Sequence, residues 1–140
     1  MKLVLSTILV GIILFLLGWL CYGMLLAEYL KPYYGFMQRP DSDMKIWAFG
    51  LASFIQALFL YIIYTQGYKG GSSIVEGTKF GLVIGLFTSI PYILFTWGGM
   101  KVTYKAVIPD GIAIFIMMLI ACIVTAFVHG KRDIKVLEGK

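Results

Sequence analysis

Four long apolar runs dominate this chain and decide what it can fold into. They cover about residues 3–27, 46–66, 74–98 and 109–128, and few charged residues interrupt them. A helix needs roughly 20 apolar residues to cross the hydrocarbon core of a bilayer, and each run supplies that length. Since a soluble core of a 140-residue chain could not cover so much continuous apolar surface, lipid must surround these runs.

The composition and the connections between the runs indicate the fold class. Soluble domains are about 45–50 % apolar and about 25 % charged, whereas this chain is 60 % apolar and 14 % charged. Backbone groups in lipid must be hydrogen-bonded within the chain, and the runs lack the alternation of membrane β-strands, so we expect helices. Short connections make neighbouring helices antiparallel. The sequence therefore predicts a single all-α domain, an integral membrane antiparallel four-helix bundle, with both termini on one side.

The positive charges indicate an orientation and exclude nucleic acid as a partner. The net charge is +5, but the cations border the apolar runs, where they meet anionic lipid headgroups. The terminus side holds seven cations, Lys2, Lys69, Lys79, Lys131, Arg132, Lys135 and Lys140, and the other side holds five, Lys31, Arg39, Lys45, Lys101 and Lys105. The positive-inside rule thus favours cytoplasmic termini. This small difference leaves a reversed or dual topology open.

Charged residues at the starts of two runs have a local explanation. Ser73 and Glu76 have the spacing of a capping box, in which each side chain bonds the other residue's backbone N–H. Pro109 suits the first position of a helix, and Asp110 suits the positive end of the helix dipole. We therefore expect no ionisable residue near the middle of any span.

The third run carries the clearest packing pattern. Gly77, Gly81, Gly85 and Ser89 are spaced four apart, so they share one helix face on which another backbone can approach closely. The sequence leaves open whether that contact lies within one chain or between chains. Pro91 follows this pattern and predicts a kink, because proline cannot donate to the carbonyl four residues earlier.

Three residues are candidates for polar ligand or pore contacts. The Gln56 amide near the middle of the second run should face inward, either in an interhelical hydrogen bond or toward a pore. Glu28 can pair with Lys31 at the interface, or else form a proton or cation site. Glu28 and Tyr22 are also the candidates for chemistry on a lipid or quinone. The sequence contains no catalytic motif, no phosphate-binding loop and no metal-ligand spacing, so we expect no catalytic residue, metal or cofactor.

Aromatic residues collect on the side opposite the termini. The outer ends of the runs hold Tyr29, Tyr33, Tyr34, Phe36, Trp47, Trp97 and Tyr104, while Trp19, Tyr22 and Tyr92 lie somewhat deeper. An aromatic belt at headgroup level accounts for such a pattern. The alternative is an outer-leaflet site for a lipid, a quinone-like molecule or a partner helix.

The stretch from Phe15 to Leu26, with Gly18, Trp19 and Tyr22, resembles the first helix of a family of small four-span bacterial membrane proteins of unknown function. The resemblance implies a bacterial inner-membrane protein and transfers no activity. Small multidrug-resistance transporters also have this size and four spans, but that resemblance would require a carboxylate in the middle of the first helix, which this sequence lacks.

These features together favour a protein without enzymatic activity, an accessory or interaction subunit of a membrane assembly. Its expected partners are the lipid bilayer and either a second copy of the chain or a larger membrane complex. An oligomeric small transporter or channel is the first alternative. The second is a membrane enzyme acting on a lipid or quinone.

Overall fold

The computed structural model describes residues 1–130, and this part of the chain consists of helices joined by short loops. In chain order the elements are α1 (Lys2–Gly18), the π-helical turn η1 (Trp19–Leu25), α2 (Ala27–Tyr34), the 3-10 turn η2 (Asp41–Asp43), α3 (Ile46–Gly67), α4 (Ser73–Gly99) and α5 (Tyr104–Gly130). The tail cations Lys131, Arg132, Lys135 and Lys140, which contributed to the orientation argument, lie outside the described residues.

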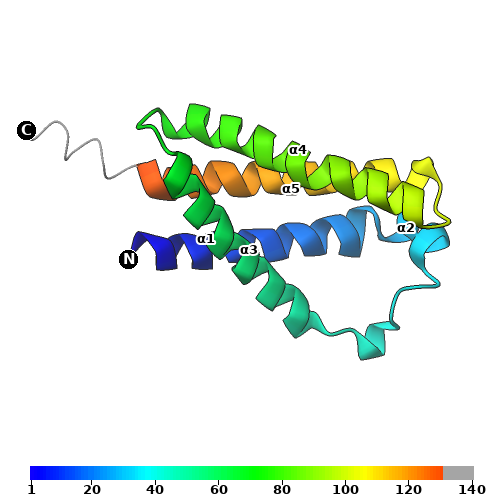
Figure 1. Ribbon diagram of the computed structural model, residues 1–140. Coiled ribbons are helices and arrows are strands. Elements are labelled where there is room, and N and C mark those ends of the chain that lie inside the picture. The colour runs from blue at the N-terminus through cyan, green and yellow to red at the C-terminus, as the bar shows by residue number, and fades with distance from the viewer. Residues whose placement is uncertain (131–140) are drawn as a thin grey trace, which may run out of the picture.

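Within residues 1–130, four helical segments are long and apolar enough to cross a membrane: Lys2–Leu25, α3, α4 and α5. The start of α1 and the end of α5 lie at one end of the bundle, and α2 lies at the other (Figure 1). The amino group of Lys2, at the start of α1, donates to the carbonyl of His129, near the end of α5, at 3.1 Å and so connects these two helix ends. Phe87 and Phe95 are 72 % and 79 % exposed in the isolated chain, as side chains that face lipid should be. The predicted antiparallel four-helix membrane architecture is confirmed.

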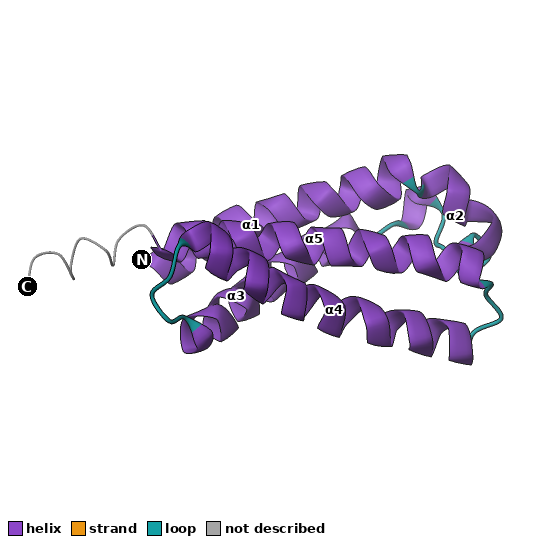
Figure 2. Ribbon diagram, turned by 90° about the horizontal axis from the view of Figure 1, so that it is seen from above, coloured by secondary structure: helices purple, strands orange, loops and turns teal. Residues whose placement is uncertain are grey.

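Helices α4 and α5 form the closest pair and run alongside each other (Figure 2). The small-residue face of α4, Gly77, Gly81, Gly85 and Ser89, is buried. A Cβ atom added to Gly77 would lie 2.8 Å from the Cβ of Ala126 and 2.9 Å from the Cα of Ile123, both in α5. The small-residue face is therefore occupied by a helix of the same chain.

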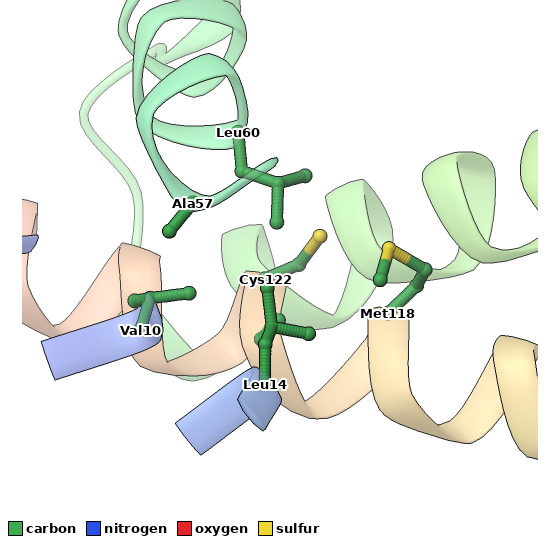
Figure 3. Packing of buried hydrophobic residues seen from close by; sticks show 7 residues of the cluster. Val10, Leu14, Ala57, Leu60, Met118 and Cys122 are labelled. Carbon is green, nitrogen blue, oxygen red and sulfur yellow. The ribbon is translucent and has the colours of Figure 1, made fainter. Parts of the chain in front are cut away.

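A second apolar core holds α1, α3 and α5 together where α3 crosses α1 obliquely (Figures 1 and 3). Its buried members are Val10 and Leu14 from α1, Ala57 and Leu60 from α3, and Met118, Ala121 and Cys122 from α5. These side chains are apolar, so dispersion contacts supply most of the attraction between them. This cluster and the α4–α5 pair fix the positions of all four spans.

The connection after the first span differs from the prediction. We expected a span ending at residue 27 and a loop over 28–45, but α2 occupies the start of this connection. Before it, the backbone N–H of Leu26 bonds the carbonyl of Cys21, five residues back, at 2.7 Å. Such π-helical bonding widens the turn and often occurs at functional sites. Tyr22 lies within this π-helical turn.

The predicted capping box is wrong. Ser72 is the residue that caps α4, and within residues 1–130 no side chain hydrogen-bonds to this cap. The backbone N–H of Glu76 instead bonds the carbonyl of Ser72 at 2.9 Å. Ser73 is already helical and its hydroxyl packs beside Gly130, so it cannot take the capping position.

Candidate ligand site around Asp110

The fourth span begins earlier than its sequence signals indicated, and this places Asp110 inside it. Helix α5 starts at Tyr104, not at Pro109. Proline has no N–H to offer to the carbonyl four residues earlier, which is that of Lys105. The hydroxyl of Tyr29, from α2, donates to this carbonyl at 2.7 Å. Helix α5 can therefore continue through Pro109, and Asp110 lies about 9 Å along the axis from its first residue.

Asp110 is buried, with only 5 % of its surface exposed. The hydroxyl of Tyr22, from η1, donates to its Oδ1 at 2.6 Å, and the hydroxyl of Tyr92, from α4, donates to its Oδ2. Three elements thus meet at one carboxylate. Because a carboxylate has about four acceptor positions, these two hydrogen bonds leave acceptor capacity unused. Asp110 takes part in no ion pair within the described part of the chain.

A cavity of about 320 Å³ adjoins this carboxylate. It is lined by Tyr22, Leu30, Tyr34, Gln38, Tyr92, Asp110 and Ile114. Ligand pockets for small molecules have volumes of about 300–1,000 Å³ and combine apolar walls with a few convergent polar groups. This cavity has both properties and lies at the small end of that range. We refer to it as the Asp110 pocket.

Tyr34 provides a second unsatisfied group in the Asp110 pocket. Its hydroxyl, carried by α2, is buried and has no hydrogen-bond partner among residues 1–130. Burial raises the pKa of Tyr34 above its usual value, and the nearby charge of Asp110 raises the pKa further. The phenol therefore stays protonated at neutral pH and can both donate and accept a hydrogen bond. Leaving such a buried group unpaired costs about 1–3 kcal/mol.

The predicted site residues are not brought together. Tyr22 lines the Asp110 pocket. Glu28 is exposed on α2, and within the structure described it forms no ion pair with Lys31, so the predicted interfacial pair is wrong. The pair Tyr22 and Glu28, proposed for lipid or quinone chemistry, does not form a common site because Glu28 is absent from the pocket.

Gln56 and Pro91 also lie outside the Asp110 pocket. Gln56 is exposed on α3 in the isolated chain. Its amide nitrogen nevertheless makes an interhelical hydrogen bond, because it donates to the sulfur of Met118 in α5, a weak acceptor, at 3.5 Å. Helix α4 continues through Pro91, which immediately precedes Tyr92. The kink there stays a prediction.

Sequence reasoning missed Asp110 by assigning it to a helix start at the membrane interface. One available signal was the depth of Tyr22 and Tyr92, which lie further into their runs than the tyrosines at the outer ends, Tyr29, Tyr33, Tyr34 and Tyr104. Two phenols below the headgroup level need polar partners, and Asp110 is the acidic residue of the fourth run. The hydrogen bonds of Tyr22 and Tyr92 to Asp110 join three segments that are distant in the sequence, η1, α4 and α5.

The Asp110 pocket can accept hydrogen bonds and positive charge, but it has no metal-ligand set. No group of three His, Cys, Asp or Glu side chains that could hold a metal occurs in the part of the chain that the structure describes. Comparison with protein-family models, with curated proteins and with solved structures finds no match to this chain. Function must therefore be argued from the pocket itself.

Proposed function

We propose that this chain is a non-enzymatic, multi-pass membrane protein that binds a small polar ligand in the Asp110 pocket. The supporting observation is a carboxylate that is 5 % exposed, lies inside a membrane span and, among residues 1–130, has only hydroxyl groups as partners. Buried charge in a membrane is costly, and such residues usually mark substrate or ion pathways. Binding by itself suffices for a receptor or accessory subunit. It is also the first requirement of the small transporter considered above.

The proposed location is a cell inner membrane with cytoplasmic termini. The distribution of Lys and Arg between the two ends of the spans supports the orientation of the termini. The resemblance to small four-span bacterial membrane proteins supports the inner membrane. The Asp110 pocket is formed at the end of the bundle where α2 lies, opposite the start of α1. In this orientation the ligand enters from the extracytoplasmic side.

A stability screen with chemically diverse compounds tests the binding function. The wild-type chain and the Asp110→Asn variant, both in lipid nanodiscs, are heated with small cations, anions and neutral molecules. A ligand at about 100 times its Kd stabilises the native state by about 2.7 kcal/mol, which raises the melting temperature measurably. Glu28→Gln is the matched control, because it removes an exposed carboxylate at the same end of the bundle.

We expect at least one class of compound to stabilise the wild type and Glu28→Gln but not Asp110→Asn. The proposal is wrong if no class stabilises the wild type. It is equally wrong if every stabilising compound acts on Asp110→Asn with unchanged affinity.

A specific observation favours a second candidate function, that of an interaction subunit. Gln56 lies on the exposed surface of α3, and within the described residues its side chain bonds only the sulfur of Met118. A carboxamide facing lipid is unfavourable, whereas a hydrogen bond to a neighbouring membrane helix contributes about 1–2 kcal/mol in model peptides. A partner helix over this surface, from a second copy of the chain or from another protein, would provide that hydrogen bond to the Gln56 amide.

Native mass spectrometry of the chain released from nanodiscs tests this second candidate. We expect Gln56→Leu to weaken association about tenfold, the equivalent of about 1.4 kcal/mol. Ser53→Ala is the control, because its hydroxyl already bonds the carbonyl of Phe49 in the same helix at 2.9 Å. A wild-type chain that is monomeric and without protein partners contradicts the candidate.

A further inference from the structure

We infer that the Asp110 pocket selects a protonated primary or secondary amine, an ammonium group that carries N–H bonds. The inference rests on the proposed function, since it names the chemical class of the ligand that the same pocket binds. Four features of the pocket lead to it: its charge, its unused hydrogen-bonding groups, its walls and its depth in the membrane.

The charge of the pocket requires a cation. Asp110 is buried without an ion pair inside residues 1–130, and a buried charge is tolerated only when it is paired and hydrogen-bonded. An anionic ligand would add repulsion to the cost of burial. A metal ion is disfavoured because the described chain supplies one carboxylate there and no cluster of metal ligands.

The unused hydrogen-bonding groups require N–H donors on that cation. The Asp110 carboxylate has acceptor positions left after the bonds from Tyr22 and Tyr92. The buried hydroxyl oxygen of Tyr34 can accept a further bond, and the Gln38 side chain at the lining offers a carbonyl oxygen. A primary ammonium has three N–H bonds to direct at these acceptors. A quaternary ammonium has none, so it would leave Tyr34 and the carboxylate unsatisfied.

The walls of the pocket fit an organic substituent on the nitrogen. Leu30 and Ile114 are apolar, and the rings of Tyr22, Tyr34 and Tyr92 line the same space. Aromatic rings attract cations through their faces, and apolar side chains favour carbon over water. A volume of about 320 Å³ is far larger than a bare ion needs.

The depth of the pocket allows two sources of the amine. Asp110 lies about 9 Å from the start of α5, close enough to the membrane interface for a dissolved amine. An aminophospholipid headgroup could present the same ammonium from the bilayer. Both sources share the chemistry that the pocket recognises, so one experiment with two arms can distinguish them.

The first arm uses soluble amines. The chain is reconstituted in nanodiscs of phosphatidylcholine and phosphatidylglycerol, which contain no N–H ammonium. Calorimetric titration then compares n-butylammonium, tetramethylammonium and n-butanol. Butylammonium and tetramethylammonium have equal charge and the same number of non-hydrogen atoms, but only the first donates hydrogen bonds. We expect butylammonium to bind at least tenfold more tightly than the other two.

Three variants connect this binding to the pocket. Asp110→Asn should weaken butylammonium binding at least tenfold, because it removes the charge. Tyr34→Phe should weaken it about three- to tenfold and leave tetramethylammonium unchanged, because it removes one acceptor. This variant loses no hydrogen bond that the structure shows among the described residues, so it should fold normally. Glu28→Gln should leave both affinities unchanged.

The second arm uses lipids. Phosphatidylethanolamine and phosphatidylcholine with identical acyl chains are offered in equal amounts, and native mass spectrometry counts the lipids retained. Preferential retention of phosphatidylethanolamine by the wild type, but not by Asp110→Asn, assigns the site to a lipid headgroup. Binding of butylammonium without this preference assigns it to a soluble amine. Either result supports the inference.

Two results overturn the inference. If tetramethylammonium or n-butanol binds as tightly as butylammonium, the N–H requirement is wrong. If neither arm gives Asp110-dependent binding while the broader screen finds a ligand of another class, the ligand class is wrong and the binding function stands. If the broader screen also finds nothing, both are wrong.

Discussion

The contact between α4 and α5 provides the most direct test of the packing that holds this bundle together. We predict that Gly77→Ala destabilises the protein by forcing the two helices apart. The new methyl group would lie 2.8 Å from the Cβ of Ala126 and 2.9 Å from the Cα of Ile123. Both neighbouring atoms are fixed to the backbone of α5, so neither can move aside as the end of a flexible side chain can.

The expected magnitude follows from a comparison with another glycine. Gly50→Ala replaces the fifth residue of α3, as Gly77→Ala replaces the fifth residue of α4, but a Cβ at Gly50 meets no atom within 4 Å among the described residues. Both substitutions gain helix propensity, about 1 kcal/mol, and this gain cancels in the comparison. Overpacking costs about 1–3 kcal/mol. Gly77→Ala should therefore be less stable than Gly50→Ala by about this amount, which is about 5- to 150-fold in the unfolding equilibrium.

Unfolding titrations with sodium dodecyl sulfate in mixed micelles, followed by circular dichroism, measure this difference. Gly81→Ala should fall between the other two, because its closest neighbour, at 2.8 Å, is the Cδ1 atom of Leu119 at the end of a flexible side chain. Equal stability of Gly77→Ala and Gly50→Ala would refute the conclusion that backbone approach on this face stabilises the bundle.

Two further predictions concern hydroxyl groups near the Asp110 pocket. Tyr29→Phe should lower the free energy of unfolding by about 1 kcal/mol, because the Tyr29 hydroxyl bonds the Lys105 carbonyl that Pro109 leaves free. In a double-mutant cycle, Tyr29→Phe should cost less in a Pro109→Ala protein than in the wild type, and equal costs would contradict this role. Tyr22→Phe should destabilise the ligand-free protein by about 1.5–3 kcal/mol, the value of a hydrogen bond to a charged group. Tyr34→Phe should leave the stability unchanged or raise it slightly, since the Tyr34 hydroxyl has no partner in residues 1–130. Thermal melts of the two variants in the same detergent measure both effects. A loss of stability in Tyr34→Phe, or no loss in Tyr22→Phe, would contradict the geometry.

The architecture of this protein follows from local properties of its chain. The length of the apolar runs predicts four spans within a few residues of their observed bounds, because hydrophobic length is a local property of the chain. The spacing of Gly77, Gly81 and Gly85 likewise predicts a helix contact, since residues four apart share a face. It did not say which helix fills that face, because every span is apolar enough to do so.

The Asp110 pocket depends on contacts between segments that are distant in the sequence. Tyr22 and Asp110 are 88 positions apart, and Tyr92 and Asp110 are 18 apart. Tyr22 reaches the carboxylate from the π-helical turn, and the hydroxyl of Tyr29 bonds the carbonyl that Pro109 leaves free. Local rules place a carboxylate after a proline at a helix start. Non-local hydrogen bonds extend this helix by more than a turn and bury the carboxylate, and no local pattern encodes such contacts.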